Sequence, residues 1–465
     1  MSPWLSKSLP ILILLAAVLV VLRRLPRVDL GHSDAFRRRR VGNWIPLGLC
    51  YAFLYFGRYN LAAIVDLLDK QKLLTKEQFG EIDGWGSAVY GIAFLLNGPL
   101  TDRWGGRATI LIATGGAVLA NAGMALAVHA ATGGQLSSAG LQQAFLVLNV
   151  VNMYFQSFGA VSIVKVNAHW FHVRERGVLG GLFGILISLG LYFAYDWSLM
   201  LAQSFGFVAA FAVPAAVLAV CFVVAWRVIR DSPQGAGFAD FDTGDASSGE
   251  RASLGLAAVA RRMLTNRVIL ILIAIEFCSG FLRQGVMKWF RSFAGAVGQK
   301  DSFVYQNWGM LLCVAGIFGG VFAGAISDHV FGSRRGPVAS VLYGGLLLGA
   351  ILAALTLGGP LLGWSMVLMS LSVIGVHGML SGTASADFGG TKNAGLVTGI
   401  IDGFVYLGTA TQAFLFARIL PKGEEAKDPA HWIQWPGAMI PVAVVGLGLC
   451  LLVWNARPKP GGGGH

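Results

Sequence analysis

The stretch Gly98-Pro-Leu-Thr-Asp102-Arg103-Trp-Gly105-Gly106-Arg107 places an aspartate and two arginines among small residues, directly after a long apolar run. A related stretch, Gly324-Ala-Ile-Ser-Asp328-His-Val-Phe-Gly332-Ser-Arg334-Arg335, follows a later apolar run. The two aspartates are 226 residues apart (328 − 102 = 226). Two arginines inside apolar runs, Arg58 and Arg283, are 225 residues apart (283 − 58 = 225). Two unrelated features that recur at nearly one offset indicate an internal repeat.

The composition excludes a water-soluble protein. Hydrophobic residues make up 55 % of the 465-residue chain and charged residues only 12 %, whereas soluble domains carry about 25 % charged residues. Disordered, coiled-coil, collagen-like and disulfide-rich proteins are excluded by the same arithmetic. A transmembrane β-barrel is disfavoured because runs such as 110–120 do not alternate polar and apolar residues. We therefore predict an all-α polytopic membrane protein.

Because a spanning helix needs about 20 mostly apolar residues, twelve spans can be predicted. They cover residues 43–65, 79–101, 108–130, 140–170, 177–202, 205–229, 267–297, 302–327, 337–357, 360–386, 394–419 and 434–456. Lys and Arg gather in alternate loops, which the positive-inside rule assigns to the cytoplasm together with both ends of this core. The net charge of +12 follows from this topology, so we expect no nucleic-acid partner.

The spans and the repeat predict five regions. These are an N-terminal apolar helix with a basic linker (1–42), a six-helix bundle (43–229), a cytoplasmic connector (230–266), a second six-helix bundle (267–457) and a tail (458–465) that we expect to be an artificial extension. The apolar run 9–22 is unlike a signal peptide because its positive charge follows it. We expect an extra transmembrane helix there, with an interfacial helix as the alternative.

Charged side chains inside the predicted spans are the main functional signal. A charge at mid-bilayer costs about 2.5 to 3.5 kcal/mol and normally marks a transport pathway. Tyr51, Tyr55 and Arg58 share one face of the first span. Glu276, seven residues before Arg283, shares its face and is either a structural ion-pair partner or a gate.

Pseudosymmetry would bring Arg58 and Arg283 to the central axis from opposite sides. The two guanidinium groups would repel each other unless an anion lay between them, and arginine matches the oxygens of phosphate or carboxylate. The sequence therefore predicts an anionic substrate. The alternative is that each arginine reaches the interface or pairs with a backbone carbonyl or with Glu276.

Three further charged residues have open roles. Lys165 and His169 lie at i and i+4 in the fourth span and either contact the anion or act as topology determinants near the cytoplasm. Asp402, on one face with Tyr406 and Thr409, either neutralises a cavity cation or binds a proton.

The repeated pattern G-x-x-x-D-R-x-G-x-R resembles the signature loop of the major facilitator superfamily. This resemblance implies two six-helix halves related by an axis along the membrane normal. It also implies that Asp102, Arg103, Arg107 and Asp328 control gating. In this reading Asp102 accepts hydrogen bonds from arginines or from a helix N-terminus and latches one conformation.

Three further motifs are similar to the organophosphate:phosphate antiporter family: Tyr55-Phe-Gly-Arg58-Tyr-Asn60, Leu282-Arg283-Gln-Gly285 followed by Trp289, and His169-Trp170-Phe171 leading to Glu175-Arg176-Gly177. The resemblance implies exchange of an organic phosphate for inorganic phosphate by rocker-switch alternating access. It also implies that Arg58 and Arg283 bind the phosphoryl group, with His169 near the site.

The chain departs from this family at three cavity positions. Tyr59 and Phe94 replace lysines, and Lys288 stands where an acidic residue is common. Lys288 thus becomes a candidate substrate contact, and the more apolar wall around Phe94 would admit an aromatic or lipid-like portion of the substrate.

We therefore predict a secondary transporter for a small, phosphorylated organic anion in the bacterial inner membrane, acting as a monomer without cofactor or metal. The alternatives are a transporter-like membrane sensor of an organic anion and a proton-coupled transporter of carboxylates or lipid-like anions. An enzyme is disfavoured because the histidines lie on different helices or loops without a metal-ligand spacing. The absence of a G-x-x-x-x-G-K-[ST] motif disfavours ATP-driven transport.

Overall fold

The computed structural model describes residues 31–172, 176–243, 264–331, 335–388 and 390–455, together with Ser8, Leu12, Ala16 and Arg261. Within these ranges, the side chains of residues 176–183, 321–322, 324–329, 335, 379, 381–388 and 390–395 are not described. The predicted N-terminal helix over 9–22 lies outside the described residues except for Leu12 and Ala16. Much of the connector and the whole tail 458–465 lie outside them too.

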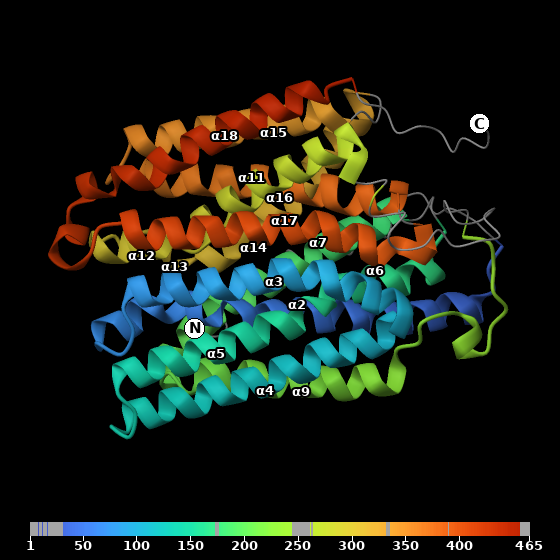
Figure 1. The fold of residues 1–465 in the computed structure, drawn as a ribbon, viewed down its shortest axis with the longest axis horizontal. Helices are drawn as coiled ribbons and strands as arrows, with labels where there is room; N and C mark the ends of the chain where they lie inside the picture. Colours follow the sequence, from blue (N-terminus) through green and yellow to red (C-terminus); the bar gives the residue numbers. More distant parts are fainter. Residues whose placement is uncertain are drawn as a thin grey trace. The chain divides into compact units, whose positions relative to one another are not determined.

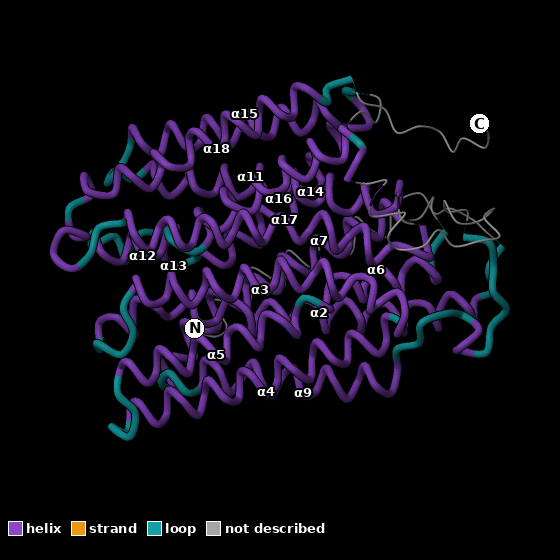
Figure 2. Tube along the Cα trace, viewed as in Figure 1, coloured by secondary structure: helices purple, strands orange, loops and turns teal. Residues whose placement is uncertain are grey.

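Every regular element in the described part of the chain is a helix (Figure 2). The elements are α2 (Asp34–Lys70), α3 (Lys76–Trp104), α4 (Gly106–Thr132), α5 (Ser138–Gln156), α6 (Phe158–Trp170), α7 (Arg176–Tyr192), the π-helix η2 (Phe193–Trp197), α8 (Ser198–Phe205), α9 (Ala209–Val228), the short η3 (Gln234–Ala236), α11 (Arg267–Met287), α12 (Phe290–Ala296), α13 (Phe303–Gln306), α14 (Trp308–His329), α15 (Arg335–Leu355), α16 (Leu361–Phe388), α17 (Gly390–Ile419), the short η4 (Gly423–Lys427) and η5 (Pro429–Ile433), and α18 (Gln434–Leu452).

Among the described residues, nine segments are long and apolar enough to cross a membrane. They are Gly106–Thr132, Ser138–Trp170, Gly184–Phe205, Ala209–Val228, Arg267–Ala296, Gly336–Leu355, Leu361–Gly378, Leu396–Ile419 and Pro429–Leu452. Helices α2, α3 and α14 lie at the three remaining predicted spans, with 37, 29 and 22 residues. At 1.5 Å per residue, each is long enough for a hydrocarbon core of about 30 Å.

The chain divides into two units, residues 1–40 and 41–465. In the first unit, Ser33 Oγ accepts a hydrogen bond from the amide of Phe36 at 3.2 Å at the start of α2. The rings of His32 and Phe36 contact each other in a tilted arrangement, with centroids 4.5 Å apart. The features described below belong to the second unit.

Polar caps fix the starts of two helices that matter for the site. At α3, Thr75 Oγ1 accepts from the amide of Gln78, and Gln78 Oε1 accepts from the amide of Thr75, which forms a capping box. At α11, Asn266 Oδ1 accepts from the amide of Val268 at 2.9 Å. These side chains satisfy amide groups that have no partner within the first turn of a helix.

Helix α17 packs against both α3 and α11, as Figure 1 shows. The helices approach so closely that a Cβ atom on Gly399 would collide with the carbonyl oxygen of Phe94 in α3. On the α11 side, a Cβ atom on Gly280 would collide with the carbonyl oxygen of Val405. Small residues of this kind allow backbones to meet inside a membrane.

The packing follows the sequence repeat. The offset of 226 residues relates Asp102 of α3 to Asp328 of α14, and it also relates α7 to the second half of α17. The structure contains both corresponding contacts, α3 with α17 and α7 with α14. Two equivalent helix pairs thus connect the predicted N-terminal and C-terminal bundles.

We predict that Gly280→Ala lowers the melting temperature of the purified protein by several degrees, because the methyl group enters space held by the backbone of α17 and overpacking costs about 1 to 3 kcal/mol. Gly344→Ala is the matched control, since the space around Gly344 is open and alanine favours the helix by about 1 kcal/mol. Equal melting temperatures for the two variants, measured in detergent, would show that close packing of α11 on α17 is unimportant.

Candidate functional site

Arg58 of α2 is buried, with 5 % of its surface exposed. Its Nε donates to Gln156 Oε1 of α5 at 2.9 Å, and its Nη1 donates to the hydroxyl of Tyr406 in α17 at 2.7 Å. The guanidinium carbon also lies 4.6 Å from the ring centroids of Tyr55 and Tyr90. Nη2 finds no hydrogen-bond partner among the described residues. Arg58 is therefore held in place by Nε and Nη1, while its Nη2 amino group makes no hydrogen bond to the described residues.

A buried hydrogen-bond network orients Gln156, the partner of Arg58 Nε. Gln156 Nε2 donates to Asn152 Oδ1 at 2.9 Å, and Asn152 Nδ2 donates to the carbonyl oxygen of Gly57 at 2.9 Å. Asn121 of α4 donates to the same carbonyl at 3.0 Å. Because each amide orients the next, the position of Gln156 Oε1 is fixed before it meets the guanidinium.

Arg283 of α11 is also buried, with 7 % of its surface exposed. Its guanidinium carbon lies 5.9 Å from the ring centroid of Tyr406, the ring whose hydroxyl accepts from Arg58. Its Nε has no hydrogen-bond partner among the described residues. Neither Arg58 nor Arg283 forms an ion pair with a carboxylate in the described part of the chain. Tyr406 thus joins two buried cations, neither of which forms an ion pair with a carboxylate of the described residues.

Aromatic rings form the wall beside Arg58. Tyr51 and Tyr55 pack edge to face at 5.4 Å, with their hydroxyl oxygens 3.5 Å apart. The ring of Tyr90 in α3 lies 3.9 Å from that of Tyr406, and Phe94 lies 4.8 Å from Tyr90. Such a wall can contact an apolar or aromatic group and also attract cations through its ring faces.

Lys288, at the end of α11, forms a buried ion pair with Asp83 of α3. Its Nζ lies 5.3 Å from the ring centroid of Tyr59. The hydroxyl of Tyr59 accepts from Gln284 Nε2 at 2.9 Å. Lys288 therefore lies near the two arginines but already has a counter-ion, which links α3 to α11.

A second buried ion pair joins η2 to the helices after α11. Arg291 of α12 pairs with Asp196, and its Nη1 donates to the carbonyl oxygen of Tyr195 at 2.7 Å. The carboxylate of Asp196 also accepts from the amides of Gly309 and Met310, at the start of α14, at 3.0 and 2.9 Å. One carboxylate thus caps a helix and neutralises a cation.

Asp102 lies near the opposite end of α3 from Asp83. It pairs with Lys165 Nζ of α6 at 3.0 Å, and its Oδ2 accepts from the amide of Leu396 in α17 at 3.1 Å. His169 Nδ1 lies 3.0 Å from the carbonyl oxygen of Lys165. The structure therefore places Lys165 beside Asp102 and His169 one turn further along α6.

The remaining predicted gating residues lie apart from the arginine pair. The guanidinium of Arg107 donates to the carbonyl oxygen of Trp226 at 2.6 Å, and its amide donates to Asp231 at 2.7 Å. Arg103 is exposed. Asp328 lies in α14, but its side chain is outside the described set.

Glu276 does not form an ion pair with Arg283. Its Oε2 lies 3.1 Å from His377 Nδ1 of α16. Asp402 of α17 is buried and interacts electrostatically with Glu276. These carboxylates lie on the C-terminal helices that also carry Arg283.

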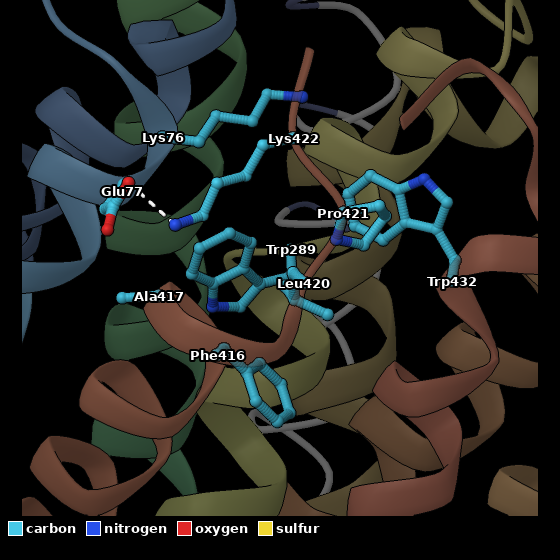
Figure 3. Close-up of a pocket in the computed structure, with 9 residues that line it drawn as sticks. All are labelled: Lys76, Glu77, Trp289, Phe416, Ala417, Leu420, Pro421, Lys422 and Trp432. Atoms are coloured by element: carbon cyan, nitrogen blue, oxygen red, sulfur yellow. Dashed lines mark ion pairs between the residues drawn. The ribbon is translucent and has the colours of Figure 1, made fainter. Parts of the chain in front are cut away.

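A pocket lies where the start of α3 meets the end of α17, as Figure 3 shows. Trp289, Phe416 and Trp432 contribute its aromatic lining, and Glu77 forms an ion pair with Lys422 at 2.7 Å. Neither arginine of the pair lines this pocket. We therefore do not assign the anion site to it.

Sequence reasoning missed several partners of the predicted residues. Gln156, Tyr90, Asp83, Asp196 and His377 were not singled out as contacts. Asn152 and Gln156 carried a usable signal, because two amides spaced i, i+4 in an apolar span are expected to bond inside the bundle. The partner of a buried charge on a distant helix has no such local signal.

A protein-family model, the Major Facilitator Superfamily, matches residues 47–413. The chain belongs to this superfamily. Its predicted fold class is thereby confirmed as that of an all-helical, multi-span major facilitator, whereas the extra N-terminal helix stays a prediction. Major facilitators are transporters, so the chain is not an enzyme.

Among curated relatives of this major facilitator, the glycerol-3-phosphate transporter of Bacillus subtilis is 25 % identical over 82 % of this chain and 86 % of its own length. The membrane sensor protein UhpC of Escherichia coli is 25 % identical over 87 % of this chain and 90 % of its own. The crystal structure of the human organic anion transporter MFSD10 (TETRAN) has 18 % identity and a TM-score of 0.56, covering 89 % of this chain and 99 % of its own. The predicted relationship to organophosphate transporters is confirmed as a distant one, and the structural match shows the shared fold.

We predict that Asp196→Asn strongly destabilises this major facilitator, because removal of one partner leaves Arg291 buried without a counter-ion, a change that costs about 3 to 5 kcal/mol. The double variant Asp196→Asn with Arg291→Met is the control and should regain part of the loss. Thermal unfolding in detergent measures both. A single variant as stable as the wild-type protein would contradict a structural role for this pair.

Proposed function

We propose that this chain is a secondary transporter that moves a phosphorylated organic anion by alternating access, in exchange for inorganic phosphate. In this proposal, Arg58 and Arg283 bind the phosphoryl group. The observation that carries it is the pair of buried guanidinium groups that share Tyr406 and have no carboxylate partner among the described residues.

The charge of the site favours a divalent anion. Two guanidinium groups in a membrane-spanning bundle carry two positive charges that tyrosine hydroxyls and a glutamine amide solvate but do not neutralise. A phosphate monoester carries about 1.5 to 2 negative charges at pH 7 and offers three strong acceptor oxygens. The nitrogens Arg58 Nη2 and Arg283 Nε have no hydrogen-bond partner in the described part of the chain. Charged hydrogen bonds to phosphate are the strongest that they can form.

The surroundings favour a substrate with an organic portion. Tyr51, Tyr55 and Phe94 provide apolar surface beside Arg58. Lys288 is close enough to interact with Arg283 but is bound to Asp83, so in this proposal it acts when that ion pair opens. The relatives named for glycerol-3-phosphate and hexose-phosphate transport support the phosphorylated class.

Alternating access needs contacts that close each end of the transporter in turn. Helix α3 provides contacts at both ends, because Asp83 binds Lys288 of α11 and Asp102 binds the amide of Leu396 in α17. We propose that the Asp102 end faces the cytoplasm, since Arg103 and Arg107 follow it. Opening the cytoplasmic side would break the contact with Leu396, and opening the other side would break the contact with Lys288.

A second candidate function is a membrane sensor. UhpC of Escherichia coli is named as a sensor and is as similar to this chain, at 25 % identity, as the Bacillus subtilis transporter. A sensor would bind the same anion without moving it. Ligand-induced stabilisation of the purified protein without exchange in proteoliposomes would favour the sensor.

We predict that Arg58→Lys and Arg283→Lys each weaken binding of inorganic phosphate about ten- to a hundredfold, because lysine loses the forked donor geometry and a charged hydrogen bond contributes about 1.5 to 3 kcal/mol. Exchange of radiolabelled phosphate in proteoliposomes should fall accordingly. The control is Arg418→Lys, an exposed arginine on α17, which should leave exchange unchanged. Wild-type-like phosphate binding in both site variants would refute the proposal.

A further inference from the structure

Glu276 is a fully buried acid near the proposed anion site. It lies on α11, seven residues before Arg283, and it is entirely inaccessible. Its Oε2 lies 3.1 Å from Nδ1 of His377, whereas its Oε1 has no hydrogen-bond partner among the described residues. A carboxylate in this position is costly when ionised, because burial removes it from water and half of its hydrogen-bonding capacity is unused.

The groups around Glu276 come from every helix packed against α11. Helix α16 provides His377, and α17 provides Asp402. Helix α18 provides Cys450, and α15 provides Tyr343, whose hydroxyl donates to the carbonyl oxygen of Ile275 at 2.6 Å. Helix α11 itself contributes Arg283 and Cys278. Apart from His377, Arg283 is the one cation among these groups, so the charge of Glu276 depends on these two residues.

We propose that Glu276 and His377 form a proton-binding site that is linked to anion binding at Arg283, so that the transporter carries a proton together with its anionic substrate. This inference rests on the proposed function, since it takes Arg283 as a ligand of the anion. It adds a second ligand, the proton, and with it a proton-driven net uptake of the anion beside the exchange of phosphates.

The linkage follows from the charges. Before it takes up the proton, the Glu276–His377 pair consists of a carboxylate and a neutral imidazole. It then carries one negative charge, which partly offsets the positive charge of Arg283. An anion bound to Arg283 neutralises the arginine in place of Glu276 and repels the Glu276 carboxylate. Proton uptake by the pair therefore becomes favourable. Coupling between two ligands is reciprocal, and a proton on the pair therefore strengthens anion binding by the same factor.

His377 and Glu276 differ in their access to water and therefore have different roles in the proposed proton site. The side chain of His377 is 23 % exposed, whereas that of Glu276 is fully covered. A proton arriving at the imidazole can reach Glu276 across the 3.1 Å contact. Glu276 shares a helix with Arg283 at a spacing of two turns, so it senses the charge state of the anion site.

The test uses the full-length protein in proteoliposomes with radiolabelled inorganic phosphate as the probe. Exchange is measured at equal pH on both sides, and net uptake is measured into vesicles without internal phosphate under an acid-outside gradient. The wild-type protein should accumulate phosphate up to about tenfold under a gradient of one pH unit, which is the equilibrium limit for one proton carried per anion. Glu276→Gln should still exchange phosphate, but its net uptake should not respond to the gradient.

One control variant and the exchange assay of the wild-type protein separate the possible failures. Glu81→Gln removes an exposed acid on α3 and should keep the response to the gradient. Because the pH changes the ionisation of phosphate equally for both variants, a difference between them reports on the protein. If the wild-type protein exchanges phosphate but its net uptake does not respond to the pH gradient, the proposed proton site is refuted and the proposed function is retained. No exchange in the wild-type protein would refute the proposed function, and the inference with it.

A binding measurement covers the case in which Glu276→Gln fails to fold. Calorimetric titration with inorganic phosphate, in two buffers of different ionisation enthalpy, gives the number of protons taken up on binding. His377→Gln should take up about one proton fewer per phosphate than the wild-type protein. Equal proton uptake by the two proteins would overturn the proposal.

Discussion

Two guanidinium groups buried in a membrane-spanning bundle are the constraint on which this structure depends. Arg58 and Arg283 are held by neutral groups, namely Gln156 and a cluster of tyrosines, and no carboxylate of the described residues pairs with them. Hydrogen bonds with neutral groups and the faces of aromatic rings lower the free-energy cost of burying a cation, but they do not neutralise its charge. The bundle is therefore arranged around a positive charge that, in our proposal, the bound anion neutralises.

In the proposed transport cycle, Tyr406 connects this charge to the movement of the helices. Its hydroxyl accepts from Arg58 of α2, and its ring contacts Arg283 of α11. It belongs to α17, the helix whose Leu396 amide is bound by Asp102. An anion that draws the two arginines together would change the position of α17 relative to α3, and so act on the contacts at both ends of α3.

The sequence predicted the features that depend on periodicity and composition. Apolar runs, the repeated Asp102 and Asp328 motifs and the matching arginines were enough to identify a major facilitator, and the family match confirms it. They also placed Tyr51, Tyr55 and Arg58 on one face, and the structure packs their side chains together. Local spacing decides such features.

The sequence did not predict which helix supplies the partner of a buried charge. Lys288 was expected to contact the substrate, and Lys165 was expected either to contact the anion or to act as a topology determinant. In the structure their ion-pair partners are Asp83 and Asp102. Glu276 was matched with Arg283 on the same helix, whereas its closest contact is His377, 101 residues later. Helical spacing shows which side chains share a face, and only the packing of helices decides what that face meets.

The most direct test of the central claim is a structure of the protein in lipid nanodiscs with inorganic phosphate, or its heavier analogue vanadate, bound. We expect one tetrahedral anion within hydrogen-bonding distance of both Arg58 and Arg283, beside Tyr406. An anion bound elsewhere, with both arginines unoccupied or paired with protein carboxylates, would contradict it.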